Sequence, residues 1–191
     1  MIDKKPEITV FAGPNGSGKS TITALSPHVK QPYINADDIR RITDCGELEA
    51  ALKAEELRIE CLNAKHDFSF ETVLSTERNL NLLRTAKEQG YFIRGFYVLT
   101  ADAELNVLRV QIRLQGGGHD VPADKIRSRY LKSLANTIEF VTLCDVCHIY
   151  DNTEDEPKRI FKKKRDEITF WTTDIWTRGK IAILVGLPLS S

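Results

Sequence analysis

The chain has 191 residues, of which 41% are hydrophobic and 28% are charged, and its formal net charge is zero. This length and composition predict one soluble globular domain with a substantial hydrophobic core. The zero net charge argues against a surface built to bind nucleic acid or an anionic membrane, and no apolar run approaches the roughly 20 residues of a membrane span. The first residues lead directly into a predicted strand without a secretory signal, so we expect a cytoplasmic protein.

A phosphate-binding sequence lies close to the N-terminus. An apolar, β-branched run at 8–12 predicts a buried strand, and residues 21–25 can begin a helix. The segment between them matches the P-loop pattern G-x-x-x-x-G-K-[ST] with Gly13, Pro14, Asn15, Gly16, Ser17, Gly18, Lys19 and Ser20, followed by Thr21. Glycines let backbone N–H groups approach a phosphate, Lys19 can reach the β- and γ-phosphates, and Ser20 can offer its hydroxyl to Mg²⁺. The strand–loop–helix context favours a nucleoside triphosphate site over a chance glycine-rich turn.

Polar residues follow the next two predicted strands. A brief strand at 33–35 precedes Asp37 and Asp38, and a strand at 68–70 ends at Glu71 and Thr72. Open parallel sheets bind their ligands at the carboxyl ends of strands. Asp37 is therefore our candidate catalytic base, although aspartates also favour the first turn of a helix, a capping role that we expect to fall to Asp38.

Helices are predicted between these strands. Residues 46–66 form a long predicted helix, and a second helix with a cap at Thr76 ends at Gly90 before a long strand at 91–99. The first helix is expected to pack through one apolar face, formed by Leu48, Leu52, Ile59 and Leu62. The alternation of strands and helices predicts a parallel sheet that is covered on both faces.

A lid is predicted next, around residues 109–130. A helix at 102–115 carries Arg109 and Arg113 on one face, and three glycines at 116–118 separate it from His119 and a second helix at 124–143. Charged helix faces are usually just solvated, but arginines beside a flexible glycine segment in a P-loop protein suit a lid that closes over a phosphoryl group. We expect Arg113 to contact phosphate, with Arg127 as a second candidate.

The last parallel strand is predicted at 146–150 and ends in Asp151 and Asn152. It overlaps a C-x-x-C-H sequence, Cys144 to His148, which is also the pattern of haem attachment. Haem attachment would need export, and a structural zinc would need a second ligand pair, which the neighbouring sequence does not provide. We therefore expect buried, reduced thiols that pack in the core.

The C-terminal part predicts a hairpin. A lysine-rich run at 159–165 is typical of an edge strand protected by charge, and residues 168–171 can pair with it. Residues 176–187 predict a short terminal helix or tail.

The absence of other nucleotide-handling motifs favours a kinase. An ATPase motor usually needs an apolar strand that ends in an acidic pair, and no such strand is obvious in the sequence. A GTPase needs an Asn-Lys-x-Asp motif, which is not present. A kinase needs a phosphate cradle, a carboxylate at the acceptor hydroxyl and arginines over the transferred phosphoryl group. Two alternatives stay open: a nucleotide-binding ATPase or switch that acts through a partner, and a 5′-hydroxyl kinase of nucleic acid, which the zero net charge disfavours.

The ordered set of motifs resembles the zeta toxin family of P-loop kinases. The matching segments, spread over roughly residues 6–170, are 13–21, Asn35-Ala36-Asp37, Phe70-Glu71-Thr72, 109–113 with 117–122, and Tyr150-Asp151-Asn152. The resemblance implies an α/β fold like that of nucleotide kinases: one domain over 1–191 with a parallel sheet, flanking helices, a helical lid and a possible C-terminal hairpin. It also implies phosphorylation of the sugar 3′-hydroxyl of UDP-N-acetylglucosamine with ATP or GTP and Mg²⁺, and a helical antitoxin as partner.

The resemblance also implies roles for single residues. Asp37 would face the acceptor hydroxyl as base, Glu71 and Thr72 would bind acceptor or metal-bound water, and Arg113 would stabilise the transferred phosphoryl group. Asp151 and Asn152 would border the nucleotide base.

One position departs from the family. Where the well-known toxins carry a second lid arginine, this chain has His119, a weaker phosphate ligand, with Arg127 as its alternative. The acceptor can therefore differ from UDP-N-acetylglucosamine. The sequence leaves the acceptor, the choice between ATP and GTP, and the oligomeric state open.

Overall fold

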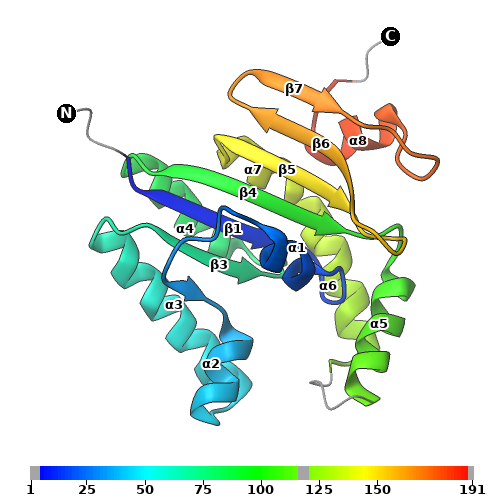
Figure 1. The fold of residues 1–191 in the computed structure, drawn as a ribbon. Coiled ribbons are helices and arrows are strands. Elements are labelled where there is room, and N and C mark those ends of the chain that lie inside the picture. The colour runs from blue at the N-terminus through cyan, green and yellow to red at the C-terminus, as the bar shows by residue number, and fades with distance from the viewer. Residues whose placement is uncertain (1–4, 116–120, 189–191) are drawn as a thin grey trace.

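The computed structural model of the protein describes residues 5–115 and 121–188. These residues form a seven-stranded sheet in the order β2-β3-β1-β4-β5-β6-β7, with helices on both faces (Figure 1). The strands are β1 (Glu7–Ala12), β2 (Tyr33–Ile34), β3 (Phe68–Thr72), β4 (Phe92–Leu99), β5 (Val146–Asp151), β6 (Lys158–Lys164) and β7 (Glu167–Phe170). The helices are α1 (Lys19–Leu25), α2 (Ala36–Thr43), α3 (Glu47–Asn63), α4 (Glu77–Glu88), α5 (Ala103–Gln115), α6 (Ala123–Ala135), α7 (Thr137–Leu143) and α8 (Arg178–Val185). The predicted α/β fold is confirmed.

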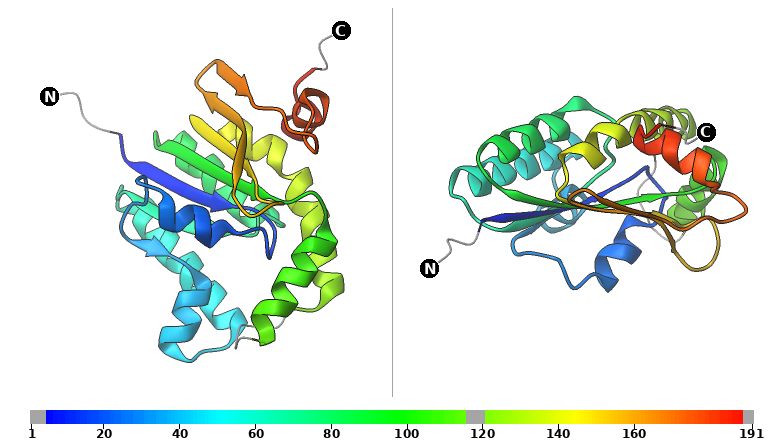
Figure 2. Two further views of the ribbon diagram at one scale, coloured as in Figure 1. Left: turned by 45° about the vertical axis from the view of Figure 1, so that its right-hand side comes forward. Right: turned by 90° about the horizontal axis from the view of Figure 1, so that it is seen from above.

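The first five strands of the sheet order are parallel, so their carboxyl ends meet at one edge. β1 lies in the middle and pairs with β3 and β4, and Val10 is aligned with Phe70 on one side and Gly95 on the other. α1 and the loop after it lie on one face of the sheet, and α3, α4, α7 and α8 lie on the other (Figure 2). α2 and α5 extend beyond the carboxyl edge on either side of the loop between β1 and α1 (Figures 1 and 2). The loop between β1 and α1 therefore lies between α2 and α5 at the carboxyl edge of the sheet.

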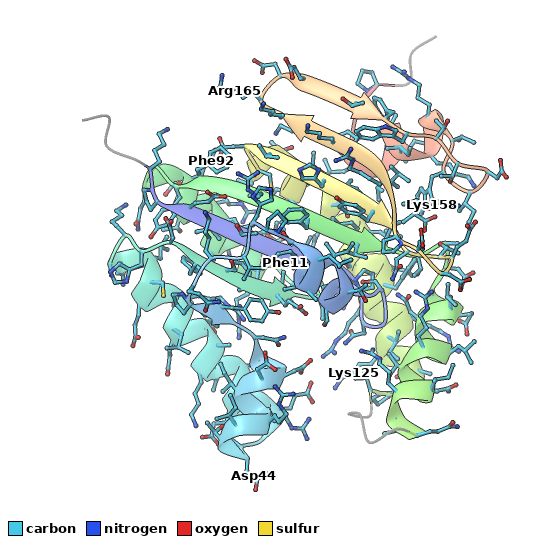
Figure 3. All side chains as sticks on the ribbon, viewed as in Figure 1. Phe11, Asp44, Phe92, Lys125, Lys158 and Arg165 are labelled. Atoms are coloured by element: carbon cyan, nitrogen blue, oxygen red, sulfur yellow. The ribbon has the colours of Figure 1, made fainter. Side chains whose placement is uncertain are left out.

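The core is asymmetric. The larger apolar cluster lies under α3, α4, α7 and α8 and includes Phe68, Tyr97 and Phe140, all fully buried. A smaller cluster beneath α1 is built from Phe11, Ile22, Phe96 and Val98 (Figure 3, where Phe11 is labelled). Since β1 and β4 contribute to both clusters, the strands that flank the P-loop are held firmly on both faces.

The predicted C-terminal hairpin is present. β6 runs antiparallel to β5, and β7 runs antiparallel to β6. Figure 3 labels Lys158 and Arg165 at the two ends of β6. The prediction that the lysine-rich strand forms the edge of the sheet is wrong, because β7 pairs with β6 on its outer side. Lys163 of β6 also donates to the carbonyl oxygens of Val141 and Thr142, at 2.8 and 3.0 Å.

Two helical predictions are wrong in detail. In α3 the expected apolar face is largely exposed, with Leu48 73% and Ile59 43% accessible. The buried face carries Ala50, Ala54, Arg58 and Cys61, together with Leu62, the one member of the expected face that is buried. Small alanines let the helix approach the sheet closely, and the periodicity of the larger side chains marked a different face.

The predicted helix at 124–143 is divided into α6 and α7. Asn136 ends α6 and precedes α7, and its side-chain amide donates to the carbonyl oxygen of Leu74 at 2.9 Å. This hydrogen bond ties the junction of the two helices to the loop that follows β3. Within the described ranges, no helix is both long and apolar enough to cross a membrane.

Candidate functional site

The P-loop has the backbone conformation that its glycines permit. Gly13 and Gly18 have φ angles of 142° and 91°, which residues with a side chain rarely adopt. A side chain at position 13 would overlap the carbonyl oxygen of Val98, and one at position 18 would overlap the amide of Asn152. α1 begins at Lys19, so the free N–H groups of its first turn and its partial positive charge point to the centre of the loop. This arrangement can serve as a phosphate cradle.

Asn152 supports this cradle from the end of β5. Its side-chain amide donates to the carbonyl oxygen of Ser17 at 2.8 Å, and its backbone N–H donates to the carbonyl oxygen of Leu99 at 2.8 Å. Asp151 is turned toward Thr153, whose backbone N–H it accepts at 3.1 Å. The buried side chain of Asn152 is thus used to hold the loop, and its predicted contact with the nucleotide base stays a prediction.

The predicted catalytic residues meet around Lys19. Its ammonium group donates to the carbonyl oxygens of Gly13 and Pro14, at 2.8 and 3.0 Å. Burial lowers the pKa of Lys19, the carboxylates of Glu71 and Asp37 act to raise it, and the guanidinium of Arg113 acts to lower it further. Charged residues from β3, α2 and α5 therefore act on Lys19 of α1 at the carboxyl edge of the sheet.

Glu71 is fixed by hydroxyl groups. Its Oε1 accepts hydrogen bonds from the Tyr33 hydroxyl at 2.7 Å and from the Thr23 hydroxyl at 3.0 Å. Asn35 in turn donates its side-chain amide to the Tyr33 oxygen at 3.3 Å. Neither Tyr33 nor Thr23 belongs to a motif, so the sequence alone does not mark them; Tyr33 reaches Glu71 because β2 pairs with β3.

Asp37 lies in the first turn of α2 with an exposed side chain. The expected capping role of Asp38 is wrong: Asn35 caps the helix, since its Oδ1 accepts the backbone N–H of Asp37 at 3.0 Å. Asp38 instead forms an ion pair with Arg41 at 2.9 Å. Asp37 is left pointing to solvent near Lys19, as a carboxylate that must receive an acceptor would be.

Thr72 is buried and its side chain is already bonded. Its Oγ1 accepts from the backbone N–H of Leu74 at 2.9 Å and from the amide of Asn79 at 2.8 Å. Its carbonyl oxygen accepts the backbone N–H of Gly13 at 3.1 Å. Thr72 therefore links β3 to the P-loop and to α4, which is a structural role. Its contact with the acceptor stays a prediction.

A cavity of about 290 Å³ lies between α3 and α4, and Arg58 and Asn79 line it. Arg58 donates to the Oδ1 of Asn79 at 2.8 Å, and its guanidinium lies 4.8 Å from the centre of the Phe70 ring. Burial lowers the pKa of Arg58 to about 10, so it stays charged at neutral pH. The other polar lining residues include Arg78, which is paired with Glu55 at 2.9 Å.

The arginines of the predicted lid have different surroundings. Arg109 donates to the carbonyl oxygens of Asn152 and Thr153, at 2.7 and 3.2 Å. Arg127 binds both carboxylate oxygens of Glu104, at 2.6 and 2.8 Å. Arg113 is exposed in the last turn of α5 and forms no ion pair within the described part of the chain. His119 and the glycines at 116–118 lie outside the described residues.

The cysteines are free thiols, and both members of the C-x-x-C pair are buried. Burial raises the pKa of the Cys144 thiol well above its ordinary value, which keeps it protonated. The predicted packing of this pair in the core is confirmed. Residues 5–115 and 121–188 contain no group of three or more His, Cys, Asp or Glu side chains that could hold a metal ion by themselves. Mg²⁺ does not need such a group, since it commonly binds one or two protein ligands together with substrate phosphates.

Comparison of the sequence with known proteins gives one relative. No family model matches the chain. An uncharacterised protein of Haemophilus influenzae (strain Rd) is 30% identical over 128 residues, which are 63% of this chain and 89% of that protein. The chain belongs to the same family as that protein.

Comparison of the fold gives more distant likenesses. A chain of the AvrRxo1-ORF1:AvrRxo1-ORF2 complex with ATP has a TM-score of 0.72 at 15% identity, covering 99% of this chain and 66% of that one. A chain of the PezAT chromosomal toxin–antitoxin system of Streptococcus pneumoniae has a TM-score of 0.63 at 17% identity, covering 98% and 81%. This protein thus spans just under two thirds of the AvrRxo1 chain that it matches. Its fold is that of zeta-toxin-like P-loop proteins, as the motifs imply.

Proposed function

We propose that the protein is a kinase that transfers the γ-phosphoryl group of ATP or GTP to a hydroxyl group of a small molecule. The observation that supports this proposal is a P-loop in which Lys19 lies against the loop carbonyl oxygens, Glu71 is hydrogen-bonded to α1, and the charges of Asp37 and Arg113 also act on Lys19. Phosphoryl transfer needs a positioned nucleotide, a group that receives the acceptor proton and positive charge around the transferred group. The P-loop, Asp37 and Arg113 are candidates for these three roles, and a similar fold has been solved with ATP.

The nucleotide phosphates would lie in the loop between β1 and α1. Backbone N–H groups of the loop and of the first turn of α1 would hold them, and Lys19 would exchange the carbonyl oxygens of Gly13 and Pro14 for phosphate oxygens. The exposed hydroxyl of Ser20 and a carboxylate oxygen of Glu71 are suitable ligands for Mg²⁺, directly or through water. When bound, Mg²⁺ neutralises charge on the β- and γ-phosphates.

The acceptor would approach Asp37 from the open side of α2. As the acceptor oxygen forms its bond to the γ-phosphorus, the bond from that phosphorus to the β-phosphate oxygen breaks and ADP or GDP leaves. The acceptor proton passes to the carboxylate of Asp37. Arg113 would compensate the charge on the transferred group, since its guanidinium is exposed and near Lys19.

The space beside Thr72 supports a small-molecule acceptor. The cavity between α3 and α4 is joined to Thr72 by the hydrogen bonds of Arg58 and Asn79, and it offers guanidinium and amide groups beside apolar side chains. Such a lining suits an anionic, partly apolar compound, and a nucleotide sugar such as UDP-N-acetylglucosamine is one candidate. An antitoxin-like partner is part of this proposal, because one similar structure belongs to a toxin–antitoxin system and the other is a complex of AvrRxo1-ORF1 with AvrRxo1-ORF2.

The test is to incubate a bacterial metabolite extract with the protein, Mg²⁺ and ATP or GTP, and to search by mass spectrometry for a product heavier by one phosphate. The matched control is the Lys19→Ala variant, which should give no such product. Steady hydrolysis of nucleotide with no phosphorylated product would contradict the proposal and favour an ATPase or switch that acts through a protein partner.

A further inference from the structure

A directed line of hydrogen bonds connects the first turn of α2 to α1 through Glu71. Asn35 accepts the backbone N–H of Asp37 with its Oδ1, at 3.0 Å. This fixes the orientation of the Asn35 amide, so that its Nδ2 faces the Tyr33 oxygen at 3.3 Å. Because that oxygen already accepts a hydrogen bond from Asn35, the Tyr33 proton is directed to Oε1 of Glu71, 2.7 Å away.

Tyr33 is the constant donor in this line, and Thr23 is not. The Thr23 hydroxyl lies 3.0 Å from Oε1 of Glu71 and 3.1 Å from the carbonyl oxygen of Lys19, but it has one proton and can donate to only one of them at a time. The Tyr33 oxygen accepts from Asn35, so its own proton is directed to Glu71 and it is the donor that does not change.

The second oxygen of Glu71 is the one left for function. Both hydroxyl groups converge on Oε1, so Oε2 is not engaged by either. Thr23 and Ser20 lie three residues apart on α1, on neighbouring positions of the same helix face. A carboxylate held against Thr23 is therefore close to the hydroxyl that would bind Mg²⁺.

We propose that Tyr33 is a positioning residue, which fixes Oε1 of Glu71 so that Oε2 faces a water molecule bound to the nucleotide-associated Mg²⁺. This inference rests on the proposed kinase function and deepens it. A carboxylate free to rotate would spend part of its time away from that water, whereas one held at a single oxygen by a donor is already in place. In this proposal the short strand β2 has a functional role, because its pairing with β3 places Tyr33 beside that strand.

The experiment compares Tyr33→Phe with a matched control, Tyr91→Phe. Tyr91 also has a hydrogen-bonded hydroxyl, which lies 3.1 to 3.2 Å from the carbonyl oxygens of Cys61, Leu62 and His66, far along the chain from the P-loop, and can donate to one of them at a time. In Tyr33→Phe we expect the Mg²⁺ concentration that half-saturates the protein–nucleotide complex to rise about 10- to 100-fold, the size of the loss of one hydrogen bond to a charged group. Fluorescence of a labelled ATP analogue during Mg²⁺ titration measures this without any acceptor. Tyr91→Phe should leave the midpoint unchanged.

A double-mutant cycle separates positioning from a general loss of structure. Glu71→Gln should weaken Mg²⁺ binding at least as much as Tyr33→Phe, and adding Tyr33→Phe to Glu71→Gln should change the midpoint less than twofold, since the two residues act as one unit. Where the acceptor is known, kcat should fall in parallel while the KM for ATP changes little. An unchanged Mg²⁺ midpoint in Tyr33→Phe, or fully additive effects, would overturn the inference. Failure of the kinase proposal would appear instead as normal Mg²⁺ and nucleotide binding in the wild type with no phosphorylated product.

Discussion

The side-chain amide of Asn152 donates to the carbonyl oxygen of Ser17 across 135 positions of sequence, at 2.8 Å. The shape of the P-loop therefore depends on the residue that follows β5, and the left-handed Gly18 leaves just enough room for that amide. The P-loop pattern alone would suggest a self-contained phosphate cradle. In this chain the loop is supported from β5 and, through the backbone of Thr72, from β3.

Asn152→Ala should weaken nucleotide binding. Removal of the amide leaves the carbonyl oxygen of Ser17 without its partner and opens space behind Gly18, so the loop loses its fixed shape. We expect the Kd for ATP to rise about tenfold, the effect of one lost buried hydrogen bond. Titration with a fluorescent ATP analogue measures it. Asn63→Ala, a change on the exposed end of α3, is the control and should bind as the wild type does; equal affinity of both variants would refute the supporting role of Asn152.

Local patterns were sufficient to predict most of the framework. The P-loop, the strands around it and the C-terminal hairpin each have a signature within a few residues: glycines at fixed spacing, β-branched runs and turn residues. Where a prediction depended on which of two helix faces meets the sheet, it failed, as in α3. Leu48 and Ile59 stay exposed while Ala50 and Ala54 are buried, because close approach depends on the small residues and on the shape of the sheet.

The site was predicted in part for the same reason. Lys19, Asp37, Glu71 and Arg113 lie at ends of predicted elements, where parallel sheets place ligands, and the structure gathers them. Tyr33 could not be found in this way, since its hydrogen bond to Glu71 depends on the pairing of β2 with β3. The separate environments of Arg109 and Arg127 depend on tertiary partners, Thr153 and Glu104, that no local pattern specifies.

Lys19→Ala should abolish phosphoryl transfer and leave the fold intact. Among the described residues, the lysine ammonium donates to the loop carbonyl oxygens of Gly13 and Pro14 and to no other group, so the scaffold does not depend on it, whereas bound phosphates would. Product formation by mass spectrometry and thermal unfolding by circular dichroism measure the two effects. Lys53→Ala, which removes an exposed lysine paired with Glu49, is the control. Full activity of a folded Lys19→Ala protein would refute the kinase proposal.

Asp37→Asn should separate binding from transfer. The carboxylate is exposed and caps nothing, so ATP affinity should stay close to that of the wild type, while transfer falls about 10²- to 10⁴-fold through loss of the group that receives the acceptor proton. Asp38→Asn removes the neighbouring carboxylate, which is paired with Arg41, and should have little effect on either. If Asp37→Asn lost ATP affinity but kept its turnover, Asp37 would act on the metal instead of the acceptor.

Cys147→Ala should cost stability and not activity. The thiol is completely buried on β5 among the residues of the main core, so its replacement by a smaller side chain leaves a small cavity. We expect the free energy of unfolding to fall by about 1 kcal/mol, measured by urea denaturation. Cys45→Ala, at a partly exposed position, is the control. Loss of activity in the folded Cys147→Ala protein, or bound haem or zinc in the purified wild type, would contradict the packing role.

The two arginines on one face of α5 should respond differently to removal. Arg109 is bonded to the carbonyl oxygens of Asn152 and Thr153, so it holds the loop that supports the P-loop. Arg109→Ala should therefore raise the KM for ATP more than it lowers kcat. Arg113 has no such partner among the described residues, and its exposed guanidinium lies close enough to Lys19 to lower the pKa of that lysine. A free guanidinium at this position is available to the phosphoryl group as charge develops on it.

Arg113→Ala should lower kcat far more than it changes the KM for ATP, because an interaction made only in the transition state has that signature. The loss should be about 10³-fold, the size found for arginines that complete a phosphoryl-transfer site. Arg113→Lys should restore little, since an ammonium lacks the planar, bidentate geometry of guanidinium. Arg127→Ala is the matched control: its guanidinium is bound to Glu104, so its loss should affect the packing of α5 on α6 more than the chemistry. Steady-state kinetics with the identified acceptor decide the matter, and a change confined to KM in Arg113→Ala, or a greater kcat loss in Arg127→Ala, would assign the phosphoryl contact to another arginine.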